Sequence, residues 1–414
     1  MDEVHEVFVE RCAGLDVHQK TVAATVRLPG PDGGRRTETK TFGTTVKRLT
    51  ELADWLASFK VTVVGMESTG VYWKPVYYLL EDRFGCWLLN ARHLHNVPGR
   101  KTDVADSVWI ARLVEQGLVR PSFVPPPPIR DLRDLTRYRR ALTEERSREV
   151  QRLDKVLQDA SIKLSAVVST LQTKSARDML AGLVAGRPPG DLAGLARGRL
   201  KDRQAELAEA LSGRFRRAHH GLLVAHILSH MDFLDDQIAQ LDARIEDLVT
   251  PFEDLVGLVA TIPGVSERGA QVLLAETGTD MTRFPDAAHL ASWAGICPGN
   301  NESAGKTRSG KTRKGSVWLR TELTAAAKAA GRTKRSYLAA HQAQIRARRG
   351  HPKAIGATRH DILTAFYFIV RDHIPYHDLG PAWAEQRNAT EQRTRRLVTQ
   401  LEQLGHTVTL TPAA

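Results

Sequence analysis

Four consecutive prolines, at positions 125–128, divide this sequence into two parts of different character. Proline fixes φ and lacks a backbone N–H, so a run of four extends neither a helix nor a central strand. Short apolar segments alternate with amphipathic ones before the run, and long amphipathic stretches follow it. A chain of 414 residues is also too long for one core. The expected domains are 1–124, 125–250 and 251–380, with a tail over 381–414.

The segment before the prolines predicts an alternating α/β domain. The pattern gives the order βββ-α-β-α-β-α, with a turn rich in Gly and Pro after the second strand. Three antiparallel strands followed by alternating helices and strands is the order of an RNase H-like fold. The predicted strands are 7–17, 22–28, 37–42, 61–66 and 86–90, and the predicted helices are 45–59, 71–83 and 103–116.

Four acidic residues fall at the ends of these elements. Asp16 ends the first strand and Glu67 follows the fourth, while Asp103 and Asp106 share one face at the start of the last helix. Taken singly, each could cap a strand or complement a helix dipole. Gathered together they would repel one another without a cation. Hard oxygen ligands suit Mg²⁺ or Mn²⁺, and two such ions can assist phosphodiester chemistry.

After the prolines, apolar residues recur at helical spacing over 129–160 and again over 233–249. These stretches predict a coiled coil or an antiparallel helical hairpin, with a Gly/Pro-rich loop at 182–198 between them. The first stretch is rich in arginine. Arg137, Arg139 and Arg140 are candidate nucleic-acid contacts, although a solvated helix face explains them equally well.

The third region predicts mainly helices, at 255–261, 268–276, 317–330 and 358–374. The first two flank a tight turn, Ile-Pro-Gly-Val, in a helix-hairpin-helix-like segment. Such a turn can present N–H groups to a phosphate, but a plain helical hairpin is the simpler interpretation.

A polar, Gly-rich loop is predicted over 300–316, and it contains Ser303. A serine in such a loop could attack a phosphodiester and keep the bond energy in a phosphoserine link. Chemistry alone favours a loop that only binds DNA, and Ser309 is an equally exposed rival. The loop and the start of the next helix carry basic residues suited to a phosphate backbone: Lys306, Arg308, Lys311, Arg313, Lys314 and Arg320.

The overall charge fits a polyanionic partner. The chain has 59 Lys and Arg against 47 Asp and Glu, a formal charge of +12, and nucleic acid is the commonest partner of such proteins. Its three cysteines form no CxxC pair, so neither a zinc site nor a disulfide framework is expected. Because no signal peptide or membrane-spanning run is evident, we expect a cytoplasmic, nucleoid-associated protein without a membrane partner.

Several motifs at both ends of the chain resemble one known family. They are GLDVHQK at 14–20, MESTGVYWKP at 66–75, KTDVADSVWIARL at 101–113, IPGV at 262–265, FPDAAHLASWAGICPGNNESAGK at 284–306 and SGKTRKGSVWLR at 309–320. The sequence is similar to the DEDD transposases of the insertion-sequence one-ten group, to which Piv-type DNA invertases are related. The motifs occur in the expected order, and no carboxylate position departs from the pattern.

The resemblance implies properties beyond those that spacing indicates. The N-terminal domain would be RuvC-like and bind Mg²⁺ through the four acids, and the nucleophilic serine would be Ser303. Active sites would join two subunits of a dimer or tetramer. A structured bridge RNA would pair with donor and target DNA, and the Arg-rich middle would serve dimerisation and RNA binding.

Two other functions remain open at this point. One is a RuvC-like nuclease that hydrolyses branched DNA with the carboxylates alone. The other is a nucleic-acid-binding protein without catalytic activity.

Overall fold

The computed structural model describes residues 8–30, 33–68, 70–91, 106–297, 302–303, 306–307 and 312–410, without the side chains of 302–303, 306–307 and 384–393. The chain forms two compact units, Met1–Val124 and Pro125–Ala414. The division falls immediately before the first of the four prolines. None of the described helices combines the length and the apolar character needed to cross a membrane.

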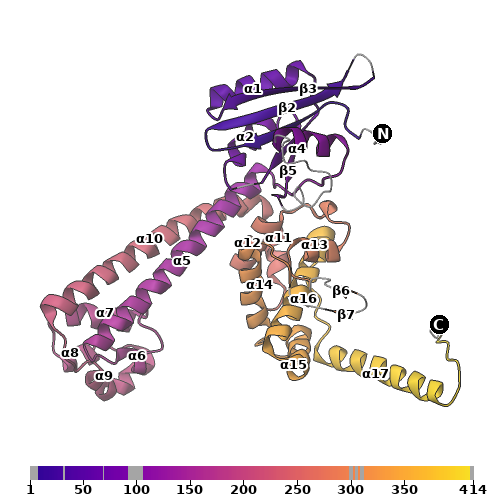
Figure 1. Ribbon diagram of the computed structural model, residues 1–414. Helices are drawn as coiled ribbons and strands as arrows, with labels where there is room; N and C mark the ends of the chain where they lie inside the picture. Colours follow the sequence, from indigo (N-terminus) through magenta and orange to yellow (C-terminus); the bar gives the residue numbers. More distant parts are fainter. Residues whose placement is uncertain are drawn as a thin grey trace. The chain divides into compact units, whose positions relative to one another are not determined.

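The first unit contains a mixed five-stranded sheet (Figure 1), and the strands follow the order β3-β2-β1-β4-β5. β1 pairs antiparallel with β2, which pairs antiparallel with β3, whereas β1, β4 and β5 are parallel. The predicted element order is confirmed for the described residues. The strands are β1 (Cys12–Val17), β2 (Thr21–Pro29), β3 (Arg35–Gly43), β4 (Val63–Glu67) and β5 (Gly85–Leu89).

The two faces of the sheet pack against different helices. Because side chains alternate along a strand, Ala13 and Leu15 of β1 lie in the core formed with α1 (Val46–Ser58) and α2 (Trp73–Leu80). Cys12 lies in a second core with α4 (Asp106–Glu115). The sequence pattern therefore produces a three-layer unit.

Helix α4 approaches the sheet closely because β1 and β4 carry glycines beneath it. A Cβ atom on Gly14 would lie 2.2 Å from the Ser107 carbonyl oxygen, and one on Gly65 would lie 2.5 Å from Val114 Cγ2. At the other end of the helix, the buried Glu115 carboxylate forms ion pairs with Arg27 of β2 and Arg35 of β3, at 2.8 and 2.6 Å. Packing and ion pairs together fix where α4 crosses the sheet.

The second unit begins with two long helices that run side by side (Figure 1), α5 (Pro127–Asp159) and α10 (Leu222–Val249). The antiparallel helical hairpin was one of the two predicted arrangements. Both helices begin before the first residue of the predicted stretches, 129 and 233. Two prolines occupy the first turn of α5, where a missing N–H costs little.

The connection between α5 and α10 is a small helical subdomain with its own core. The prediction of a loop over 182–198 is wrong, because buried Leu192 and Ala193 anchor a short helix there. The connecting elements are α6 (Leu164–Val167), α7 (Lys174–Val184), α8 (Pro189–Ala193), a 3-10 helix (Gly198–Arg203), α9 (Gln204–Ala210) and a π-helical turn (Arg217–Gly221).

The remaining helices enclose a core in which Phe366 is fully buried. Several of them were not predicted: α13, α15 and α17, the last of which lies in the expected tail. The loop predicted over 300–316 also contains a short antiparallel pair, β6 (Glu302–Ser303) and β7 (Lys306–Thr307). The helices are α11 (Glu253–Ala260), α12 (Glu267–Thr277), α13 (Ala287–Trp293), α14 (Val317–Ala330), α15 (Tyr337–Arg349), α16 (His351–Asp372) and α17 (Pro381–Gln403), with 3-10 turns at Thr250–Phe252 and Met281–Arg283.

The Ile-Pro-Gly-Val turn between α11 and α12 packs against protein. Gly264 has a positive φ of 88°, and a Cβ atom there would lie 2.4 Å from the Ala326 carbonyl oxygen of α14. The N-terminus of α12 is capped by Ser266, whose hydroxyl accepts from the Gly269 N–H. These contacts favour the plain helical hairpin over a phosphate-binding turn.

Candidate functional site

Asp16 and Glu67 lie at the carboxyl ends of two neighbouring parallel strands. Leu15 of β1 is paired with Met66 of β4, so each acid is the next residue along its strand. Asp16 is two residues after Gly14, which faces α4, and Glu67 is two residues after Gly65, which also faces α4. Side chains two positions apart share a face, so both acids belong to the α4 face of the sheet.

Helix α4 runs opposite to β1 and brings Asp106 toward the same edge. Ser107 lies against Gly14, whereas Ala111, one turn later, accepts a hydrogen bond from the Cys12 thiol at 3.4 Å. The first residue of the helix, Asp106, is therefore at the end where β1 reaches Asp16. Asp103 falls outside the described residues, so its predicted place beside Asp106 stays a prediction.

The described acids do not form a closed ligand cluster. Asp16 is 28% exposed, and its Oδ2 lies 3.2 Å from His18 Nε2. Within the described ranges, the three-residue group whose ligand atoms lie within 4.8 Å of one another is a different one, Asp159, His219 and His220. The donor type of the strand-end acids nevertheless fits a hard cation, because all the candidate ligands are carboxylates.

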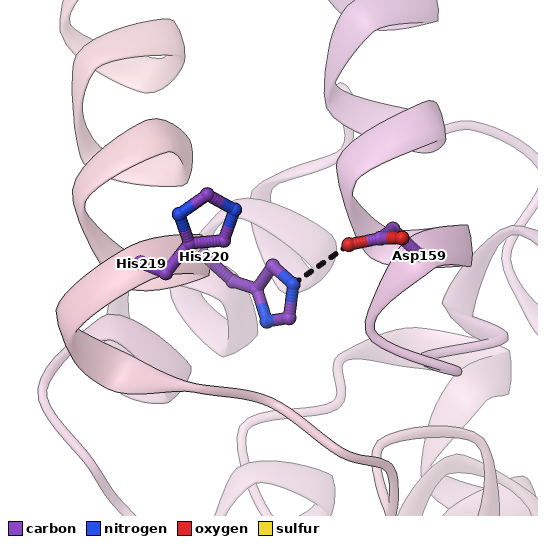
Figure 2. A group of neighbouring side chains, drawn as sticks. All are labelled: Asp159, His219 and His220. Carbon is purple, nitrogen blue, oxygen red and sulfur yellow. Dashed lines mark hydrogen bonds and ion pairs between the residues drawn. The ribbon is translucent and has the colours of Figure 1, made fainter.

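The Asp159–His219–His220 group lies where α5 ends and the π-helical turn precedes α10 (Figure 2). His220 is 2% exposed, and its Nδ1 accepts from the Arg216 backbone N–H at 3.0 Å. The ring proton must then be on Nε2, which donates to Asp159 Oδ2 at 2.9 Å. Because both ring nitrogens are engaged, a metal at Nε2 would require an imidazolate, and we assign these residues to fold stabilisation. The same hydrogen bond lowers the pKa of Asp159 below its usual value.

Zinc is accordingly expected to leave the thermal unfolding midpoint unchanged. His220→Ala should destabilise the protein by about 2 kcal/mol, because it leaves Arg216 N–H without its acceptor and opens a cavity. His219 is exposed, so His219→Ala should change stability by less than about 0.5 kcal/mol. Thermal melts with and without Zn²⁺ test both statements. A zinc-dependent stabilisation that disappears in either variant would contradict the assignment.

The serine loop is described in part. Ser303 is the residue of β6 paired with Lys306 of β7, whereas Ser309, Arg308 and Lys311 fall outside the described residues. Arg313 and Lys314 are exposed just before α14, which begins after its cap, Ser316. The first turn of α14 contains Arg320, whose Nη2 donates to the Arg313 carbonyl at 3.2 Å.

The three hairpin arginines have protein partners. Arg139 pairs with Asp242 of α10, and Arg140 pairs with Glu144 at 2.9 Å and with Glu322 at 3.7 Å. The Arg139 and Arg140 side chains are 25% and 35% exposed, so both ion pairs are partly shielded from solvent and stabilise the packing around α5. Their role in nucleic-acid binding stays a prediction, and the ion pairs compete with it.

Arg137 belongs to a buried network around Glu276, which the sequence analysis missed. Glu276 Oε1 and Oε2 accept from Arg137 Nε and Nη2 at 2.7 and 2.9 Å, and Oε2 also accepts from Ser316 Oγ at 2.8 Å. The carboxylate is 2% exposed. It therefore joins α5, α12 and the residue that ends the serine loop. The partners are far apart in sequence, so no local pattern could have revealed them.

The comparisons with known proteins identify both ends of the chain. Residues 13–162 match the family model for IS110-type DEDD transposases, described as "Transposase". Residues 256–342 match "Transposase IS116/IS110/IS902 family". The first matched range spans most of the first unit and continues into the second, the other lies within the second unit, and together they cover more than half of the chain.

Curated relatives match over shorter segments. An insertion element IS110 protein of 43.6 kDa from Streptomyces coelicolor is 30% identical over 169 residues, 40% of either chain. The pilin gene-inverting protein of Moraxella bovis is 39% identical over 71 residues, 16% of this chain and 22% of that protein. The matched segments thus span less than half the length of these relatives.

A solved structure of RuvC from T. thermophilus with a Holliday junction substrate aligns with 27% of this chain and 99% of its own, at 12% identity. The TM-score of 0.20 is too low to support a statement about the fold. The two family models define a protein of mobile DNA elements. The chain belongs to the IS116/IS110/IS902 family of transposases.

Proposed function

We propose that this protein is a transposase or site-specific recombinase that cuts and rejoins DNA through Ser303. The observation that carries the proposal is the match of transposase family models to both units, in chain order. The relatives named as an insertion-element protein and a gene-inverting protein support DNA rearrangement as the outcome. The charge of +12 fits a nucleic-acid substrate.

The sheet and its acids support a metal-assisted reaction. The order β3-β2-β1-β4-β5, with β1 central and α4 across it, is the arrangement we assign to an RNase H-like, RuvC-like domain. Asp16 and Glu67 lie on the α4 face of the sheet, Asp106 begins α4 at the same edge, and Asp103 precedes Asp106 in the sequence, so all four would hold Mg²⁺ or Mn²⁺. When bound, such an ion stabilises negative charge on phosphate oxygens.

The covalent chemistry is assigned to Ser303. Its Oγ attacks the phosphorus of a DNA strand, the bond to the leaving strand oxygen breaks, and the serine proton ends on that oxygen. The phosphoserine ester conserves the bond energy, and attack by a strand hydroxyl on the same phosphorus releases the serine. Lys306, Arg308, Lys311, Arg313 and Lys314 would hold the backbone during both steps.

The remaining segments are given roles that follow from the family resemblance. The segment 125–250 would serve dimerisation and binding of a structured bridge RNA, and 251–380 would form the transposase domain, followed by 381–414. The complete active site would join two subunits of a dimer or tetramer. The coiled pairing of α5 with α10 is compatible with a rigid spacer in such an assembly.

The decisive experiment compares Ser303→Ala with Asp16→Asn on a DNA substrate that carries the element ends. Wild-type protein should give a protein–DNA adduct that survives denaturation, whereas Ser303→Ala should give none and should lose strand cleavage by at least about 1000-fold. Asp16→Asn should keep DNA binding but lose cleavage. Ser309→Ala is the matched control and should retain the adduct.

The alternative enzyme, a RuvC-like nuclease, makes the opposite prediction for serine. If Ser303→Ala cleaved DNA at the wild-type rate and no adduct formed, hydrolysis by the carboxylates alone would replace our proposal. If Asp16→Asn retained full strand exchange, the metal-assisted reaction would be excluded.

A further inference from the structure

Arg320 and Arg359 project from two helices that pack against each other, α14 and α16. Within the part of the chain that the structure describes, neither arginine forms an ion pair. Arg359 Nη1 donates to Thr324 Oγ1 at 3.4 Å, and Arg320 Nη2 donates to the Arg313 carbonyl at 3.2 Å. Both of these hydrogen bonds therefore go to neutral acceptors.

The positive charges of the two guanidinium groups destabilise the folded state. The Nε atom of each is buried and has no hydrogen-bond partner. Burial, followed by the positive charge of Arg320, lowers the pKa of Arg359. Unpaired charges at short range destabilise a fold. The arginines of the hairpin differ, since Arg137 and Arg139 each pair with a carboxylate.

A single anion would accept from the Nη donors that these two hydrogen bonds leave unused on both side chains, whereas the buried Nε atoms stay out of its reach. Arginine offers five N–H donors in a planar fork that matches phosphate oxygens. Thr324 lies one turn after Arg320 on α14, and its hydroxyl donates to the Arg320 backbone carbonyl at 2.6 Å while it accepts from Arg359 at 3.4 Å, so Arg359 reaches the face of α14 that carries Arg320. A phosphate at this point would remove the repulsion that the two cations now exert on each other.

The position connects this pair to the serine loop. Arg320 is bonded to Arg313, at the end of the basic segment that follows Ser303, whereas Arg359 comes from a distant part of the sequence. We propose that Arg320 and Arg359 together bind one backbone phosphate of the DNA strand handled by the serine loop. The choice of DNA rests on the proposed function, whereas the anion site rests on the arginine pair.

The test uses Arg359→Met in the full-length protein, with Lys353→Met as control. Lys353 is an exposed residue of the same helix, so its replacement removes the same charge. At low salt, Arg359→Met should be at least as thermally stable as wild type, because the repulsion is gone and methionine keeps the apolar contacts. Inorganic phosphate should raise the melting temperature of the wild type more than that of Arg359→Met.

Binding to duplex DNA gives a second, independent readout. One lost phosphate contact should weaken binding uniformly across sequences and reduce the slope of log K against log salt by about 0.9. Lys353→Met should retain the wild-type slope. The same titration with RNA of matching sequence tests the choice of nucleic acid.

The outcomes separate the two proposals. If Arg359→Met lost stability and bound DNA with an unchanged slope, the pair would be structural and the inference overturned. A salt slope that changed for RNA binding but not for DNA binding would also overturn the proposal of a DNA phosphate site. A reduced DNA slope in a protein that forms no Ser303 adduct would support the phosphate site while rejecting the recombinase. A Ser303 adduct together with an unchanged salt slope in Arg359→Met would support the recombinase while rejecting the phosphate site.

Discussion

Replacing Glu276 with glutamine is expected to lower the free energy of unfolding by about 3 kcal/mol. The carboxylate is almost fully buried and accepts from Arg137 and Ser316. Glutamine would remove the charge and direct an NH₂ group at a donor, leaving the Arg137 guanidinium without a counter-charge. The expected loss of unfolding free energy is smaller than for a fully buried ion pair, because the Arg137 side chain remains 33% exposed.

Urea unfolding of Glu276→Gln, of Arg137→Met and of the double variant measures the coupling. The double variant should be more stable than Glu276→Gln, because the uncompensated charge is gone. Glu144→Gln removes the exposed partner of Arg140 and is the matched control, with an expected change below about 0.5 kcal/mol. Equal effects at Glu276 and Glu144 would contradict the buried network.

A methyl group at position 14 is expected to destabilise the N-terminal unit by about 3 kcal/mol. In Gly14→Ala the new Cβ would lie 2.2 Å from the Ser107 carbonyl oxygen and 2.4 Å from the Ala111 backbone nitrogen. Both are backbone atoms of α4, so a rotamer change gives no relief and the helix must move. Any displacement of α4 also moves Asp106 relative to β1.

Hydrogen exchange distinguishes this local effect from general unfolding. The amides of α4 should lose protection in Gly14→Ala, while those of α1, on the opposite face, should lose less. Gly34→Ala is the control, because a Cβ atom there meets nothing within 4 Å. Wild-type stability and unchanged α4 protection in Gly14→Ala would show that the helix does not depend on this close approach.

Much of the fold could be predicted because local sequence patterns cause it. The period of two in the strands and of 3.6 in the helices follows from backbone geometry, so both long helices and the sheet elements were recognisable. The structure divides into two compact units immediately before the four prolines, at Val124. Failures occurred where tertiary packing overrode composition, as in the Gly- and Pro-rich segment that forms α8 around Leu192.

The candidate site divides in the same way. The acidic residues could be placed at strand ends and at a helix start from their positions alone, and the basic loop around Ser303 is a local run of charge. The partner of each arginine side chain could not be predicted from local sequence patterns. Arg137 pairs with Glu276, which is 139 residues away in the sequence, whereas Arg359 donates to the Thr324 hydroxyl and forms no ion pair with any described residue.

The sequence by itself determined which segments are strands or helices and which residue types stand at their ends, because those properties depend on neighbours along the chain. Only the tertiary structure decided that α4 runs against β1 over Gly14 and that Asp16 and Glu67 share its face. It also decided which arginines are neutralised. Packing distance and charge pairing depend on residues that are close in space, whatever their separation in sequence.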